Sequence, residues 1–143
     1  MDVDQLISDL AQSQGSVALD FAMQAFLEPQ SAAEGLLAPQ CTTNLVEAIA
    51  MVKRVYPGWS WRVAECSVSD DAWVMPDFNC PEHGARLRSE LCQATDWAGI
   101  TDVDLRPSGR SAVALCISML KAWEALNDSS HKAPQAAAAE AGA

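Results

Sequence analysis

The sequence predicts a single α+β domain in which helices cover a three-stranded antiparallel sheet, an α-β-β-β-α sandwich with an N-terminal helical extension. Apolar residues recur at helical spacing as far as Tyr56, alternate with a period of two from Trp59, and return to helical spacing from Ser111. The chain has 143 residues, about the length of one domain. Half of them are hydrophobic, which is the composition of a globular protein.

Residues 1–28 form the N-terminal helical segment of this prediction. The spacing of Val3, Leu6, Ile7 and Leu10 predicts a first helix that ends at Gln14-Gly15. Ser16 is a suitable N-cap for a second helix. We expect this helix to stop at Glu28, because a residue before proline is driven out of the α region. Its expected buried face consists of Leu19, Ala22, Met23 and Phe26.

Residues 42–127 form the predicted α-β-β-β-α domain, after a linker that runs from Pro29 to Cys41. Its first helix is capped by Thr43 or Asn44, and Glu47 completes a capping box if Asn44 is the cap. That helix ends at Pro57-Gly58, a tight turn. Its apolar stripe is expected to consist of Leu45, Ile49, Val52 and Tyr56.

Three strands and a closing helix complete the domain. Residues 59–64 and 72–75 predict a hairpin with a turn at Ser69–Asp71. A polar loop over residues 76–86 follows, and the third strand is expected within residues 97–105. The helix predicted at residues 111–126 has an apolar face, and the alanine-rich residues 128–143 are expected to be disordered. The pattern does not decide whether the helices at 44–56 and 111–126 share one face of the sheet or enclose it.

Charge and cysteine content favour a soluble intracellular protein. The net charge is −10, so the surface would repel nucleic acid and favour a basic protein partner. The first ten residues are acidic and do not resemble a secretory signal, and no apolar run is long enough to span a bilayer. Five cysteines at irregular spacing favour reduced thiols, with Cys66 and Cys116 expected to be buried. Self-association is left open.

Three segments resemble the phage ABA sandwich-like family of small phage and prophage proteins. They are Thr42–Ala48 (TTNLVEA), Pro57–Trp61 (PGWSW) and Ser111–Ala122 (SAVALCISMLKA). The N-terminal helical segment is also similar to the usual start of that family. The resemblance implies an α-β-α sandwich and a phage or prophage setting in a bacterial cytoplasm. The family has no established activity, so the resemblance implies no catalytic residue and no cofactor.

Weak chemical motifs occur in and just after the predicted polar loop at residues 76–86. Cys80, His83 and Cys92, with Cys66 from the sheet, could supply zinc ligands, but a second closely spaced pair is missing. A Cys-His nucleophile would require one of these thiols beside His83 or His131, and His131 lies in the predicted tail. The acidic pairs Asp70–Asp71 and Asp102/Asp104 are explained by a turn and a solvated strand face. Residues 107–111 could hold one anion at a helix start, although a capped helix explains them equally well.

Tryptophan is the most suggestive residue type, because four of the five tryptophans fall in or beside the predicted sheet. Alternation places Trp59 and Trp61 on one face, and Trp73 could lie opposite one of them across the hairpin. They either pack beneath the helices or form an exposed patch that binds a partner. In the second case Arg62 and Arg54 would supply polar anchors. The candidate partner-binding residues are therefore Trp59, Trp61, Arg62 and Trp73.

These observations lead to three functional hypotheses. The first is a phage- or prophage-encoded, non-enzymatic protein that docks on a host or phage protein, for example to inhibit a host defence complex. The second is a small-ligand binding protein or enzyme, with a nucleotide or metal near residues 80–92 and the start of the last helix. The third is a minor virion or assembly component.

Overall fold

The computed structural model describes residues 2–134 and confirms the predicted fold class. Within these residues the chain forms seven α-helices and one three-stranded antiparallel sheet. The helices are α1 (Val3–Ala11), α2 (Val17–Leu27), α3 (Pro29–Ala33), α4 (Leu45–Val55), α5 (Gly84–Glu90), α6 (Trp97–Thr101) and α7 (Ser111–Leu126). The strands are β1 (Trp59–Glu65), β2 (Asp70–Pro76) and β3 (Val103–Leu105), and a 3-10 turn, η1, covers Ser129–His131.

The sheet is antiparallel, as predicted, and has the order β1-β2-β3. Trp59 pairs with Pro76, and Arg62 pairs with Trp73. Along β2 the buried positions are Asp70, Ala72, Val74 and Pro76, and the residues between them are half-buried. One face of the sheet is therefore packed against the core. The hairpin turn spans residues 66–69 and not 69–71 as predicted, because Asp70 and Asp71 already belong to β2.

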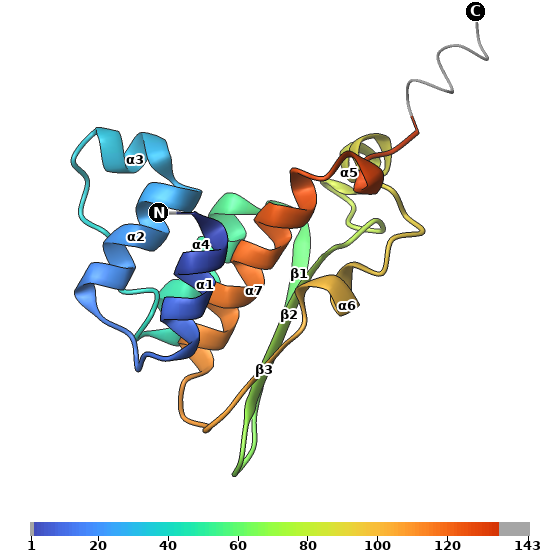
Figure 1. Ribbon diagram of the computed structural model, residues 1–143. Coiled ribbons are helices and arrows are strands. Elements are labelled where there is room, and N and C mark those ends of the chain that lie inside the picture. The colour runs from blue at the N-terminus through green and yellow to red at the C-terminus, as the bar shows by residue number, and fades with distance from the viewer. Residues whose placement is uncertain (1, 135–143) are drawn as a thin grey trace, which may run out of the picture.

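The helices α4 and α7 lie on the same face of the sheet, which decides between the two alternatives that the sequence left open. Figure 1 shows the sheet edge-on, with α7 and α4 against it and α1 and α2 farther out. Leu6, Leu10 and Met23 from α1 and α2 join the same core as α7 and the sheet. The N-terminal helical segment therefore shares the hydrophobic core of the 42–127 region.

The central helix α7 is buried around most of its circumference, not along one face as predicted. Every residue from Ser111 to Leu120 is buried. The sequence explains this burial, because Val113, Ala114 and Ile117 leave this part of the helix without a charged side. No helix within residues 2–134 is both long enough and apolar enough to cross a membrane.

The predicted helix starts are confirmed, apart from one detail. The Ser16 hydroxyl accepts a hydrogen bond from the Leu19 N–H at 3.1 Å, and the Asn44 side chain accepts from Val46 at 3.0 Å. Asn44 is thus the cap of α4. The capping box is wrong, because the Glu47 carboxylate accepts a hydrogen bond from the Gln40 N–H at 3.1 Å.

Several connecting segments have more structure than predicted. The linker contains α3, and α5 begins at Gly84, inside the segment predicted to be a polar loop. The segment expected to hold only the third strand begins with α6, and β3 is limited to three residues. The predicted disordered tail begins with η1, after which Lys132 forms an antiparallel bridge with Leu91. The rest of that tail, residues 135–143, lies outside the described residues.

Candidate functional site

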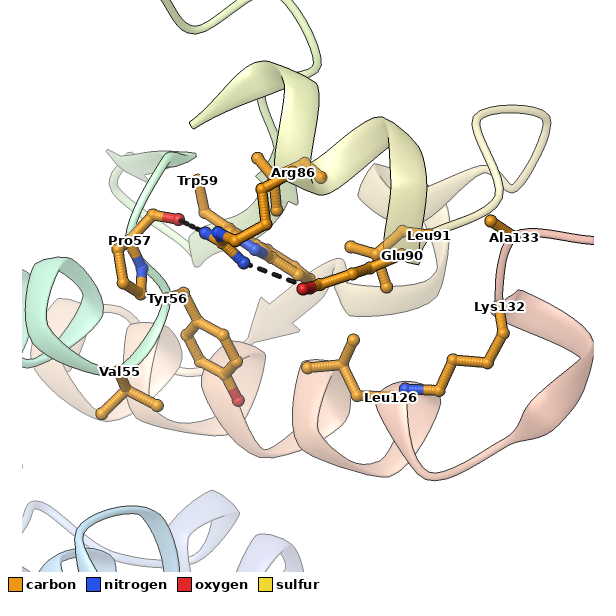
Figure 2. Close-up of a pocket in the computed structure, with 11 residues that line it drawn as sticks. Val55, Tyr56, Pro57, Trp59, Arg86, Glu90, Leu91, Leu126, Lys132 and Ala133 are labelled. Atoms are coloured by element: carbon orange, nitrogen blue, oxygen red, sulfur yellow. Dashed lines mark hydrogen bonds and ion pairs between the residues drawn. The ribbon is translucent and has the colours of Figure 1, made fainter. Parts of the chain in front are cut away.

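A pocket of about 500 Å³ lies where the end of α4, the start of β1 and helix α5 meet (Figure 2). Its floor contains Tyr56 and Trp59, whose ring centroids are 4.9 Å apart. Val55, Leu87, Leu91 and Leu126 supply aliphatic walls, and Arg86, Glu90 and Lys132 are the charged residues of the rim. The pocket thus combines a mainly apolar lining with a few polar groups, as small-molecule sites do.

Local backbone geometry holds the pocket in shape. Gly58 has a φ of +86°, and a Cβ atom there would lie 2.4 Å from the Cβ of His83. Glycine is therefore needed for the close approach of α5 to the start of β1. On the other side, the Ala133 N–H donates to the Glu90 carbonyl at 3.0 Å, which fixes Lys132 beside Leu91.

The polar groups of the pocket differ in how they are engaged. The Arg86 guanidinium bonds to the Glu90 carboxylate at 3.2 Å and to the Pro57 carbonyl at 3.0 Å. The Tyr56 hydroxyl donates to the Met119 carbonyl at 2.7 Å, and burial raises the pKa of Tyr56 above its ordinary value. The Lys132 ammonium forms no hydrogen bond or ion pair with any other residue between positions 2 and 134.

The structure divides the four candidate partner-binding residues between two faces of the sheet. Trp59 is buried in the core, and Trp61 is half-buried beneath the Lys53 ammonium, which lies 5.4 Å from its ring centroid. Arg62 and Trp73 pair with each other on the opposite face. Trp73 therefore does not lie opposite Trp59 or Trp61, and the four residues do not form one patch. Arg54 pairs with Glu28 at 2.9 Å.

The metal-ligand candidates are not gathered into one cluster. Within residues 2–134 no group of three or more His, Cys, Asp or Glu side chains is placed to hold a metal ion. Cys66, expected to be buried, is exposed in the hairpin turn, where the Ser69 hydroxyl and the N–H groups of Val68 and Ser69 lower the pKa of its thiol. Cys116 is buried as predicted, together with Cys41.

Cys92 and His131 lie close together, although the sequence analysis set His131 aside because it falls in the predicted tail. The Cys92 N–H donates to the His131 carbonyl at 2.9 Å, and the Thr95 hydroxyl lies 3.3 Å from Nδ1 of His131. The same hydroxyl, with nearby N–H groups, lowers the pKa of the Cys92 thiol. The His131 ring also packs against Trp97 at 5.6 Å. Within the described residues the thiol and the imidazole make no direct hydrogen bond, so His131 serves to anchor η1 on Trp97.

A second surface feature lies on α2 and the loop after α3. Val17, Phe21 and Leu37 are exposed to 69%, 49% and 89%, and they border a hollow of about 370 Å³ that also contains Ala38. Asp20 and Glu47 are the charged residues of this hollow. We call the three exposed apolar residues Val17, Phe21 and Leu37 the α2 surface. The sequence carried a signal for it, because Val17 and Phe21 lie one turn apart and outside the predicted buried face.

Comparison with models of protein families, with curated proteins and with solved structures finds no significant match to this chain.

Proposed function

We propose that this chain is a non-enzymatic binding protein that docks on a basic region of another protein through the α2 surface. The observation that carries the proposal is the cluster of exposed apolar side chains on α2 and the loop at Leu37. In the phage or prophage setting that the resemblance implies, the partner would be a host or phage protein. Docking would then act by inhibition, for example of a host defence complex.

Burial distinguishes the two sides of α2. Met23 and Leu27 are buried in the core, whereas Phe21 is half exposed and Val17 largely exposed. The core therefore does not require an aromatic ring at position 21. Exposed apolar residues grouped around a hollow are typical of protein-binding surfaces, and an aromatic residue at the centre often supplies much of the binding energy.

The framework around the hollow is held rigidly by a buried hydrogen-bond network. The Asp20 carboxylate accepts a hydrogen bond from the Thr42 N–H at 2.9 Å, and the Ser16 N–H donates to the Thr42 hydroxyl at 3.1 Å. The Gln24 side chain donates to the Leu36 carbonyl at 3.1 Å. These contacts fix the loop that carries Leu37 against α2. The surface is therefore preformed, and this chain would lose little conformational entropy when a partner binds.

Charge indicates the chemistry of the partner. Residues 1–52 contain no Lys, Arg or His. They contain seven acidic residues: Asp2, Asp4, Asp9, Asp20, Glu28, Glu34 and Glu47. A segment with an apolar side chain for the hollow and Lys or Arg beside it would complement this surface, and the opposite charges would accelerate encounter.

Affinity capture with matched variants tests the proposal. Wild-type protein, Phe21→Ser and Val68→Ser are immobilised and exposed to bacterial lysate in low and high salt. Val68 is 57% exposed in the hairpin turn, away from α2, so Val68→Ser is the control for loss of a surface apolar side chain. We expect a partner that binds wild type and Val68→Ser alike, binds less in high salt, and loses roughly 30-fold in affinity for Phe21→Ser.

The captured partner is then purified and mapped on the wild-type chain by hydrogen exchange. Protection over residues 17–38 is expected. Equal capture by all three proteins, or protection confined to the sheet face that carries Arg62 and Trp73, would refute docking through the α2 surface.

A further inference from the structure

We propose that the pocket between α4, β1 and α5 binds a small organic anion with a flat apolar body, such as an aromatic carboxylate or sulfonate. This goes beyond the proposed function, because it concerns different residues and a different class of ligand. The pocket is built from chain segments far apart in the sequence, from Val55 to Ala133. Figure 1 places α5 and η1 on the opposite side of the molecule from α2.

The size and walls of the pocket fit a small molecule with a ring. Its volume of about 500 Å³ falls within the range of about 300–1,000 Å³ typical of ligand sites. Tyr56 and Trp59 line the floor, although only 5% and 8% of their surface is exposed, and Trp59 is supported by Trp97 at a centroid distance of 5.5 Å. A planar ring could pack against this surface with little rearrangement, since the supporting side chains are fixed in the core.

The cations at the rim select the charge of the ligand. Figure 2 shows Arg86 and Lys132 entering from opposite sides of the pocket, with Glu90 between them. The chain as a whole carries a net charge of −10, yet this pocket has two cationic residues and one acidic residue. Because Arg86 is already bonded to Glu90, Lys132 provides the positive charge that a ligand can bind.

The floor of the pocket offers few hydrogen-bond donors, so it does not favour a ligand with many hydrogen-bond acceptors. The Tyr56 hydroxyl is bonded to the Met119 carbonyl at 2.7 Å and so does not offer its proton to a ligand. The remaining walls are aliphatic. Recognition would thus combine an apolar ring contact with one ionic contact at Lys132.

Two dyes of matched shape and different charge test the proposal on the full chain. The anionic probe is 8-anilinonaphthalene-1-sulfonate and the neutral probe is N-phenyl-1-naphthylamine, both followed by fluorescence titration. The variants are Lys132→Met, the blocking variant Leu126→Trp, and Arg62→Met, which removes the same charge from the open face of the sheet. Circular dichroism melting establishes that each variant is folded.

We expect saturable one-to-one binding of the sulfonate by folded wild type. Lys132→Met should weaken it roughly fivefold to tenfold, the effect of one charged contact at a partly exposed site. Arg62→Met should leave it within about twofold, and Leu126→Trp should abolish it. The neutral dye should be insensitive to Lys132→Met, because it lacks the sulfonate. Absence of saturable sulfonate binding by folded wild type, equal weakening by Lys132→Met and Arg62→Met, or unchanged binding by folded Leu126→Trp would each overturn the assignment.

Discussion

Arg110 is the side chain whose replacement should destabilise this fold most sharply. It is only 5% exposed. Its guanidinium donates to the carbonyls of Ala11 and Ser13, at 2.7 and 3.1 Å, and to those of Arg106 and Pro107, at 2.7 and 3.2 Å. The arginine thus joins the end of α1 to the turn before α7, between residues that are 97 and 99 positions apart in the sequence.

The expected cost follows from what Arg110→Met would leave behind. Carbonyls at the end of a helix have no partner within the helix, and here the arginine satisfies them. A hydrogen bond between a charged and a neutral group contributes about 1.5–3 kcal/mol, and the arginine makes four such bonds. The four acceptor residues are themselves partly exposed, so water can replace most of the lost bonds, and we expect a total cost of about 3 kcal/mol. That is a large fraction of the stability of about 5–15 kcal/mol typical of a domain.

Urea unfolding followed by tryptophan fluorescence measures this cost, and thermal unfolding should show a fall in Tm of roughly 10 °C. Arg110→Lys keeps the charge but loses the planar fork of donors, so an intermediate cost of about 1.5 kcal/mol is expected. Arg106→Met is the matched control, because its guanidinium is exposed and pairs with Asp104 at 3.4 Å; it should change stability by less than about 0.5 kcal/mol. A cost for Arg110→Met below about 1 kcal/mol, or equal to that of Arg106→Met, would refute the reasoning.

Three further predictions use groups that the fold buries or exposes. Tyr56 is the single tyrosine, and burial raises its pKa, so absorbance at 295 nm should show no tyrosine ionisation in the native protein near pH 10. The stability that Tyr56 contributes is complete below its ordinary pKa of 10.0 and is lost as the pH rises above that value. Thr42→Val should cost about 1.5–3 kcal/mol in urea unfolding, because it removes the hydroxyl bonded to the buried Asp20 carboxylate. Iodoacetamide should label Cys66 in the native protein and Cys116 only in denaturant, as read by peptide mass spectrometry.

The parts of the fold that could be predicted are those with a strong local signal. The change of period at Trp59 places the hairpin correctly, and the caps Ser16 and Asn44 mark the starts of α2 and α4. These signals arise within a few residues of each other, so they do not depend on the rest of the molecule.

The short helices could not be predicted because their stability comes from tertiary contacts. Helix α5 has one large buried side chain, Leu87, which is too few for a recognisable stripe. Helix α6 has five residues, less than two turns. Its Thr101 hydroxyl bonds to both the N–H and the carbonyl of Val74, at 3.0 and 2.6 Å, and so continues the edge of β2 where β3 is absent. No sequence period reports such a contact.

For the candidate sites too, local sequence patterns predicted some features, whereas features that depend on tertiary contacts were missed. Alternation placed Trp59 and Trp61 on one face correctly, but the depth of each tryptophan depends on which helices cover that face. The pocket was missed because Lys132 lies in a segment whose composition predicts disorder, and only the bridge to Leu91 brings it to the rim. Its assembly from distant segments leaves no compact motif in the sequence.

The distribution of charge connects the two proposed binding surfaces. If the acidity served solubility alone, acidic and basic residues could be mixed throughout the chain, yet no cation occurs before Lys53. Residues 1–52 also carry exposed Val17 and Phe21, which work against solubility. Across the molecule, Arg86 and Lys132 give the pocket the opposite sign. The two surfaces have opposite charge and share no residue, so they should bind their ligands independently, and salt should weaken both interactions. A saturating concentration of the anionic dye should therefore leave the affinity for the basic partner unchanged.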